Sequence, residues 1–274
     1  MAFSFWAKLI LVIFLKTILI TGATGGIGSE LCKVFAYHQY NLILVGRNEI
    51  KLSSLKEELE KQYPIQVESI LAELTLPNVG HMIYEETLKR NLKVDILCNV
   101  AGLGVYGDFL ERDFVDHKEL LSVNLYATLE LCHYFGNMMK KEGHGRIINI
   151  ASISSFFPGP YMATYYASKA YILSFSIALA KEVRPYGVGV SVVCPGVIPT
   201  EFYPKAEADL KNSYLLKRMP LENPKALAKI IYKKAMHNKL IIKNGIINRI
   251  YIFFSVFLPL RIKASIVSWV QRKK

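Results

Sequence analysis

The sequence has few cysteines and histidines, and neither residue type forms a pattern that would bind a metal ion. Cys32, Cys98, Cys132 and Cys194 are widely spaced and include no CxxC pair, which excludes the usual zinc and iron–sulfur spacings. Such cysteines are typical of small buried residues in a reducing compartment, so we expect a cytoplasmic protein. The six histidines form no ligand cluster, and no serine, histidine and acid pattern indicates acyl transfer. We therefore expect no metal site.

The chain also lacks an apolar run at its start that is long enough to cross a membrane. Residues 2–15 are hydrophobic apart from Ser4 and Lys8. A helix of that length covers roughly 21 Å of a hydrocarbon core about 30 Å thick. The run enters the first expected strand without a small-residue cleavage site, which argues against a cleaved signal peptide. The sequence thus predicts an apolar N-terminal arm over residues 1–16, either an interfacial anchor or a hydrophobic arm.

Acidic residues are scarce in the last quarter of the chain. Residues 205–274 hold 16 Lys and Arg against 3 Asp and Glu, a net charge of +13, whereas the whole chain carries +12. Because residues 250–260 are apolar and uncharged, we predict a basic, apolar, helical extension over residues 245–274. Its expected partner is a membrane surface, and nucleic acid is not expected. The alternative is that this stretch packs on the domain or on a second subunit while its lysines stay solvated.

Apolar segments alternate with amphipathic ones over residues 17–244, for which we expect a single domain. Strands are expected at residues 17–21, 41–45, 65–71, 94–98, 146–151 and 188–193, and helices at 26–38, 48–63, 78–92, 113–141 and 161–184. This alternation predicts parallel strands joined by right-handed crossovers. The fold class is therefore α/β, a doubly wound, mostly parallel, Rossmann-type sheet of about seven strands with helices on both faces.

A glycine-rich turn, TGATGGIG, follows the first expected strand and opens the first helix. Glycines let the backbone approach a pyrophosphate closely, and the helix N-terminus offers it free N–H donors. In this context the turn predicts dinucleotide binding, and the alternative is a purely structural turn. The expected contacts are Gly22, Thr24, Gly26, Ile27 and Gly28.

Arg47 stands at the end of the second expected strand, about twenty residues past the glycines, where an acidic residue would hold the ribose hydroxyls of NAD. A guanidinium suits a 2′-phosphate, which an acid would repel. We therefore expect NADP(H) in preference to NAD(H). The alternative is that Arg47 is an ordinary solvated loop residue.

Tyr165 and Lys169 lie four residues apart in an expected helix, which puts a phenol and an ammonium on one face. A nearby cation favours the phenolate, so we expect Lys169 to bring the pKa of Tyr165 from about 10 toward neutrality. Tyr165 is therefore the candidate general acid/base. The same spacing is common in amphipathic helices, and the pair alone decides nothing.

Taken together, the motifs resemble the short-chain dehydrogenase/reductase family over residues 17–200. The glycine turn matches the family's cofactor fingerprint, residues 99–102 resemble its NNAG motif, and Tyr165 with Lys169 matches its YxxxK pair. Ser152 lies thirteen residues before the tyrosine, as in the family, and Asn124 fits the family's asparagine. Two positions depart from the pattern: Val100 replaces the second asparagine of NNAG, and Glu73 stands where the family usually has an aspartate.

The resemblance implies hydride transfer between nicotinamide and a carbonyl or secondary alcohol. Tyr165 would protonate the substrate oxygen, and Ser152 would donate to the developing alkoxide. Lys169 would bond the nicotinamide ribose, and Asn124 would hold a water that links Lys169 to solvent. The further cofactor contacts that it implies are Glu73, Asn99, Ala101, Gly102, Tyr165, Lys169, Pro195, Gly196 and Thr200.

Three segments rich in apolar and aromatic residues are expected to set the substrate: residues 103–109, 156–161 and 197–220. They predict a small lipophilic carbonyl or alcohol. The family resemblance also implies a homo-oligomer. Two alternatives stay open: a non-catalytic nucleotide-binding or membrane-associated protein on the same fold, and an epimerase or dehydratase with no net cofactor turnover.

Overall fold

The structure, a computed structural model, describes residues 15–202 and 221–271. The expected N-terminal arm, apart from its last two residues, lies outside this part of the chain, and so do Tyr203 and Tyr214 of the third expected substrate segment. The described strands and helices, in chain order, are β1 (Thr17–Thr21), α2 (Gly26–Tyr37), β2 (Asn41–Gly46), α3 (Glu49–Gln62), β3 (Val67–Leu71), α4 (Val79–Lys89), β4 (Ile96–Asn99), α5 (Phe114–Leu121), α6 (Ala127–Glu142), β5 (Gly145–Ile150), α7 (Ala163–Val183), β6 (Val188–Cys194), α9 (Pro224–Met236), β7 (Ile241–Lys243), α10 (Ile246–Ser255) and α11 (Leu260–Gln271).

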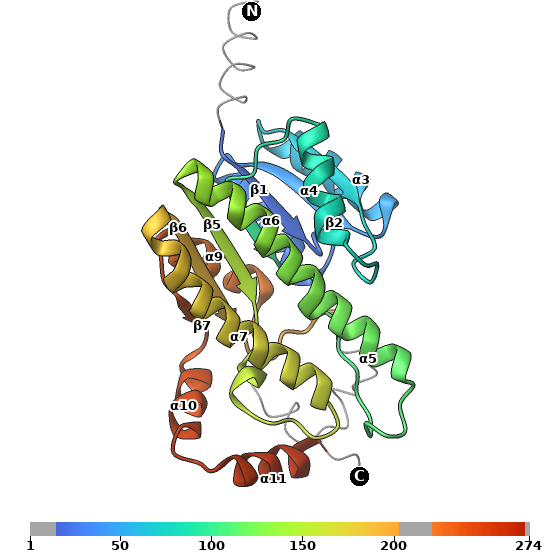
Figure 1. The fold of residues 1–274 in the computed structure, drawn as a ribbon, viewed down its shortest axis with the longest axis vertical. Helices are drawn as coiled ribbons and strands as arrows, with labels where there is room; N and C mark the ends of the chain where they lie inside the picture. Colours follow the sequence, from blue (N-terminus) through green and yellow to red (C-terminus); the bar gives the residue numbers. More distant parts are fainter. Residues whose placement is uncertain (1–14, 203–220, 272–274) are drawn as a thin grey trace, which may run out of the picture.

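The strands form one parallel sheet of seven, in the order β3-β2-β1-β4-β5-β6-β7. The order reverses between β1 and β4, and in such sheets ligands bind beyond the carboxyl ends of the strands at that reversal. The predicted doubly wound α/β fold is confirmed (Figure 1). The three-residue β7 and the preceding α9 are elements that the sequence pattern did not locate.

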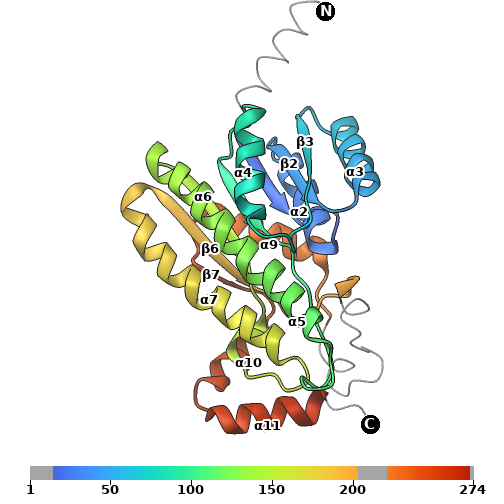
Figure 2. The same cartoon turned by 45° about the vertical axis from the view of Figure 1, so that its right-hand side comes forward.

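Alternating strand residues divide the core between the two faces of the sheet. Ile18 and Ile20 of β1 pack with α2, α3 and α9 in one apolar cluster, whereas Leu19 packs with α4 and α6 in another. Successive side chains of a strand point to opposite faces, so a continuous apolar run serves both layers. The helices accordingly lie on both sides of the sheet (Figures 1 and 2).

The long helix expected at residues 113–141 is interrupted. Asp113 begins α5 by accepting a hydrogen bond from the Val115 N–H at 3.2 Å, and residues Ser122–Tyr126 then form a π-helical turn before α6. A π turn inserts an extra residue into the helix, which changes the direction of its side chains, and such turns are frequent at functional sites. This one contains Asn124, a candidate site residue, and lies within the helical region that the sequence predicted.

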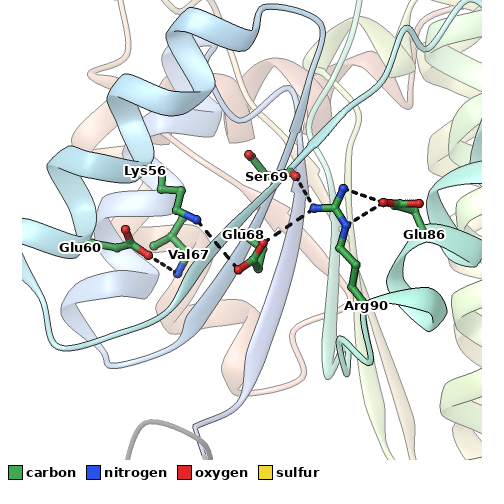
Figure 3. A network of polar contacts seen from close by, with 7 residues as sticks. All are labelled: Lys56, Glu60, Val67, Glu68, Ser69, Glu86 and Arg90. Carbon is green, nitrogen blue, oxygen red and sulfur yellow. Dashed lines mark hydrogen bonds and ion pairs between the residues drawn. The ribbon is translucent and has the colours of Figure 1, made fainter. Parts of the chain in front are cut away.

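The outer strand β3 is held by a polar network on the side of the sheet far from β7 (Figure 3). Arg90 donates to the Ser69 carbonyl at 3.0 Å and lies 2.6 Å from a Glu86 carboxylate oxygen. Glu68 of the strand lies 3.8 Å from Arg90 and 4.0 Å from Lys56 of α3. Charged side chains along an edge strand discourage pairing with another chain, so the network protects this edge.

Beyond β7, helices α10 and α11 lie below the amino end of α7 in the view of Figure 1, at the end of the molecule opposite the start of β1. Among the described residues no helix is both long and apolar enough to span a bilayer. Each of these two helices presents large apolar side chains to solvent, among them Phe253 and Trp269.

Candidate active site

The turn between β1 and α2 is shaped by backbone contacts that leave no room for side chains. Gly22 adopts a left-handed conformation with φ of 63°, and a Cβ on Gly28 would lie 2.1 Å from the Gly22 carbonyl oxygen. A Cβ on Gly26 would lie 2.5 Å from Cγ2 of Thr200, so a glycine at this position leaves room for the loop that follows β6. The spacing of these glycines is therefore required by the local packing.

The N-terminus of α2 is open for an anion. Gly25 caps the helix with no side-chain hydrogen bond, and the first turn contains no acidic residue. Unpaired N–H groups and the positive end of the helix dipole therefore face the space above the turn. That is the arrangement that a pyrophosphate requires.

A pocket of about 450 Å³ extends from this turn across the carboxyl ends of the central strands. It brings together most of the residues that the sequence selected. Those lining it are Gly22, Thr24, Gly26, Ile27, Gly28, Arg47, Glu73, Ala101, Gly102, Ser152, Tyr165, Lys169, Pro195, Gly196 and Thr200.

Asn99 and Asn124 do not line the pocket but lie behind its wall. The Asn99 amide donates to Oδ1 of Asn149 at 2.9 Å and is buried in the core, and the expected contact of Asn99 with a cofactor stays a prediction. Asn124 accepts from the Leu103 N–H at 2.8 Å and donates to the Leu103 carbonyl at 3.0 Å. It thereby fixes the strand-end loop that carries Ala101 and Gly102.

At the outer end of the pocket Arg47 and Glu73 face each other. Nη1 of Arg47 lies 3.5 Å from Oε2 of Glu73, and both side chains are partly exposed. Lys51, one helical turn after the cap residue Asn48, lines the same end and lies 3.9 Å from Glu201. Sequence reasoning missed Lys51, although its position in the first turn of α3 places it beside Arg47.

Tyr165 projects into the pocket from the first turns of α7, with the Phe202 ring 5.2 Å away between centroids. Burial raises the pKa of the Tyr165 phenol above its ordinary value, and hydrogen bonds from the Ser152 and Ser154 side chains lower it in part. Ser152 lies just beyond the end of β5, and its hydroxyl accepts from the Ser154 N–H at 3.2 Å. Ser152 and Tyr165 both line the pocket, and the Ser152 hydroxyl lies close enough to act on the Tyr165 phenol.

Lys169 contacts the backbone more closely than it contacts Tyr165. Its ammonium donates to the Ile150 carbonyl at 3.0 Å and lies 5.9 Å from the centre of the Tyr165 ring. Burial lowers the pKa of Lys169 to about 8. The expected lowering of the Tyr165 pKa by Lys169 is therefore wrong for the protein without cofactor, because desolvation of the phenol is the largest effect on it.

The Ile150 carbonyl is a site group that the sequence analysis did not name. A backbone oxygen cannot be recognised as a site group from the residue type. Only the packing of α7 on β5 places the Ile150 oxygen beside Lys169. The sequence analysis did not name Ser154 as a site residue either, although Ser154 is close to Ser152 in the chain. The structure brings both hydroxyls to Tyr165. Among the described residues no group of histidine, cysteine and acidic side chains could hold a metal ion.

The family model described as short chain dehydrogenase matches residues 16–211. The chain belongs to the short-chain dehydrogenase/reductase family. This member is 30% identical over 182 residues to a 7beta-hydroxysteroid dehydrogenase of Mediterraneibacter gnavus, an alignment that covers 66% of this chain and 68% of that one. It is 34% identical over 186 residues to a very-long-chain 3-oxoacyl-CoA reductase of Pyrenophora tritici-repentis, covering 66% of this chain and 54% of the relative.

Solved structures of family members superpose on most of the chain. A short-chain dehydrogenase from Sphingobium yanoikuyae in complex with NADPH has a TM-score of 0.78 at 27% identity, covering 89% of this chain and 93% of that one. The bulky-bulky ketone specific alcohol dehydrogenase from Comamonas testosteroni has a TM-score of 0.74 at 26% identity, covering 89% and 92%. This short-chain dehydrogenase/reductase is therefore an NAD(P)-dependent oxidoreductase, as the sequence predicted.

The shape and the polar groups of the pocket fit a nicotinamide dinucleotide. The glycine turn leaves a concave surface that any side chain at Gly26 or Gly28 would fill, and it faces the open N-terminus of α2. The pocket continues from there to Tyr165 and Lys169, which lie at its far end from Arg47. The site thus offers an anion site, a basic outer end and a proton donor in one continuous space.

Proposed function

We propose that this chain is an NADP-dependent carbonyl reductase or alcohol dehydrogenase with Tyr165 as general acid/base. The observation that carries the proposal is the meeting of the Ser152 and Tyr165 hydroxyls, the Lys169 ammonium and the glycine turn in one pocket. A reduced nicotinamide supplies the hydride when it is bound there. The chain's own side chains supply the proton and the polar contacts at the substrate oxygen.

In the direction of reduction, Tyr165 donates its phenolic proton to the oxygen of the substrate. Its raised pKa keeps the phenol protonated and ready to donate. Ser152 donates a second hydrogen bond to the same oxygen as negative charge develops on it. In oxidation the same groups act in reverse, with Tyr165 as the proton acceptor.

Lys169 and Asn124 supply the route by which the proton is replaced. A Cβ on Gly102 would lie 3.3 Å from Nζ of Lys169 and 3.4 Å from Oδ1 of Asn124, so both groups flank the same glycine. A water between them would link Lys169 to solvent. Because burial brings the Lys169 pKa to about 8, this ammonium can release and recover a proton near neutral pH.

The preference for NADP(H) rests on Arg47, with Lys51 beside it. Together they put two cations at the outer end of the pocket, where a 2′-phosphate would lie; each lies beside an acid, Glu73 or Glu201, whose contact of 3.5 Å or 3.9 Å is long enough to give way to a phosphate. Replacing Arg47→Ala should weaken NADPH binding about 10- to 100-fold, since charge-assisted hydrogen bonds contribute roughly 1.5–3 kcal/mol each. NADH binding should change by less than about threefold. Equal losses for both cofactors in fluorescence titrations would contradict the assignment.

The substrate is proposed to be lipophilic. Leu103 and Phe202 line the catalytic end of the pocket, and the names of the relatives, a steroid dehydrogenase and a bulky-ketone alcohol dehydrogenase, agree with an apolar carbonyl or alcohol. The test is NADPH consumption with a panel of lipophilic ketones and aldehydes. Turnover of several of them, together with no turnover of sugars or charged metabolites, is expected.

Two rival functions give distinct results in that experiment. A non-catalytic nucleotide-binding protein would bind NADPH and consume none with any substrate. An epimerase or dehydratase would convert substrate while the NADPH absorbance stayed constant, which product analysis would detect. The presence of Ser152, Tyr165 and Lys169 in one pocket favours the reductase over the first rival, because it retains a complete proton-transfer set.

We also propose that residues 245–274, and the N-terminal residues 1–15, bring this cytoplasmic enzyme to a membrane surface. The described helices α10 and α11 and the turn between them expose Phe253, Phe257 and Trp269 together with Arg261, and the sequence from residue 245 onward contains no acidic residue. An apolar face with basic neighbours suits an anionic lipid surface, and two like-charged copies would repel each other there.

Flotation with anionic liposomes tests this partner. The full chain should float, and a chain truncated near residue 243 should float less. If both stay with the soluble fraction, the membrane proposal fails. The homo-oligomer implied by family membership is checked by light scattering without liposomes.

A further inference from the structure

A buried carboxyl group lies behind the cofactor pocket and outside the catalytic set. Glu222 precedes Asn223, the residue that caps α9, and its side chain is only 8% exposed. One oxygen, Oε1, accepts a hydrogen bond from the Asn248 amide at 2.6 Å. Asn248 belongs to α10, where it is 4% exposed. This contact joins the chain before α9 to the first C-terminal helix.

The same carboxyl group touches the loop that follows β6. The Glu222 N–H donates to the Val197 carbonyl at 2.8 Å, next to Gly196 in that loop. A Cβ on Gly196 would lie 3.1 Å from Oε1 of Glu222 and 2.4 Å from the Asn248 amide nitrogen. Pro195 and Gly196 line the cofactor pocket, so Glu222 and Asn248 pack directly against the back of its wall.

Burying the Glu222 carboxyl group costs free energy, and a role limited to holding α10 would not explain that cost. Burial raises the pKa of the Glu222 carboxyl, and the bonds from Asn244, Gly196 and Asn248 offset that in part. Its other oxygen, Oε2, has no hydrogen-bond partner among the described residues. Well-packed apolar residues would hold a helix at least as firmly as a buried charge. The Glu222 carboxylate and the Asn248 amide instead pack directly against Gly196, while the Glu222 N–H holds the adjacent Val197 carbonyl.

We propose that Glu222 and Asn248 are positioning residues that hold the Pro195–Gly196 loop in the shape that receives the dinucleotide. The inference rests on the proposed function only in that the pocket binds NADPH. The Glu222 carboxylate packs against Gly196, and Asn248 holds that carboxylate in place from α10. The first C-terminal helix is therefore part of the cofactor site, although none of its residues lines the pocket.

The test measures the dissociation constant of NADPH by fluorescence titration, together with the unfolding temperature of each variant. Glu222→Ala removes the acceptor and should weaken NADPH binding about tenfold or more, the usual scale for a hydrogen bond to a charged group. Glu222→Gln keeps an acceptor of the same shape and should stay within about threefold of the native chain. Asn248→Asp sets two carboxyl groups against each other and should resemble Glu222→Ala.

Ser255→Ala is the matched control on the same helix. Ser255 is also buried on α10, but its hydroxyl bonds only the Ile252 carbonyl in its own helix, at 2.8 Å. It should alter the unfolding temperature at most and leave NADPH affinity unchanged. If the role of Glu222 is purely structural, Glu222→Ala will also change the unfolding temperature at most and leave the NADPH affinity unchanged. That result would overturn the inference.

Failure of the proposed function has a different signature. If the native chain binds neither NADPH nor NADH, both that function and this inference are overturned. If the native chain binds NADPH and Glu222→Ala binds it equally well, only this inference is overturned. Should Glu222→Ala fail to fold, the Asn248→Asp and Glu222→Gln pair decides, because equal affinities in these two folded variants would contradict the proposal.

Discussion

The two ends of the pocket are built by different means. At the glycine turn the shape comes from the backbone, with Gly22 in a left-handed conformation and Gly28 against a carbonyl oxygen. At the catalytic end, side chains of the C-terminal helices reach the elements around Tyr165: the Gln271 amide of α11 donates to the Tyr166 hydroxyl at 2.6 Å, and Lys263 donates to the Phe156 carbonyl at 3.5 Å. The comparison suggests that cofactor binding and substrate turnover can be altered separately.

The sharpest separation is expected at Tyr165, which lies where the two ends meet. Tyr165→Phe removes the proton donor and keeps the ring against Phe202, so turnover should fall about 10²- to 10⁴-fold, the usual contribution of general acid catalysis. NADPH affinity should stay within about twofold. Steady-state kinetics and fluorescence titration measure the two quantities. An equal loss of turnover and of NADPH affinity would contradict the separation between the two ends of the pocket.

Tyr166→Phe is the control for that variant. Tyr166 follows in the sequence, but its hydroxyl bonds Gln271 and does not line the pocket. Turnover in Tyr166→Phe should fall far less than in Tyr165→Phe. A comparable fall would show that the phenol of Tyr165 is not the specific proton donor.

Lys169 should give the next largest effect, seen in stability against pH without cofactor. Its pKa is lowered from 10.5 to about 8 by burial, so between these values the unfolded chain binds a proton that the folded chain has released. The free energy of unfolding therefore rises with pH through this window, and the full cost of the buried charge is present below about pH 8. Relative to Lys169→Met, the native chain should gain about 3 kcal/mol across the window.

Urea unfolding at several pH values measures this difference. The comparison needs only the change in the gap between the native chain and Lys169→Met, because other titrating groups are common to both. Two curves that stay parallel from pH 8 to pH 10.5 would mean that Lys169 is solvated in the folded chain.

The same contrast explains how much the sequence could predict. The glycine turn, Ser152, Tyr165 and Lys169 are encoded in short local patterns whose spacing follows from the strand and helix that carry them. Contacts between residues far apart in the chain have no such signature. The Lys169 ammonium and the Ile150 carbonyl meet through the packing of α7 on β5, and Asn248 reaches Glu222 only after β7 and α10 are placed.

The errors have the same origin. Lys169 was expected to act on Tyr165 because both lie on one helical face, but desolvation and a competing backbone acceptor are tertiary effects. Two details were likewise beyond the sequence: the bond of the Asn99 amide to Asn149 on the neighbouring strand, and the π turn at Asn124 within the predicted helical region.

A substitution at Gln271 tests the catalytic end of the pocket, which is built by side chains, and we expect a smaller effect there. Gln271→Leu leaves the buried Tyr166 hydroxyl without its partner, which should cost about 1–3 kcal/mol of stability. The KM of the carbonyl substrate should rise several-fold, while NADPH affinity stays unchanged. Adding Tyr166→Phe should restore part of the stability, because removing both polar partners avoids the unpaired group. An additive loss in the double variant would show that the bond between them contributes nothing.

The smallest effect is expected at Arg90, on the β3 edge and away from both ends of the pocket. Arg90→Ala removes the contacts with Glu86, Glu68 and the Ser69 carbonyl (Figure 3). Because the side chain is 41% exposed, the loss of stability should stay at or below about 1 kcal/mol. NADPH affinity and turnover should be unchanged, as measured by urea unfolding beside titration and kinetics. A change in either would mean that the edge network supports the pocket through β3, and the division between scaffold and site would have to be redrawn.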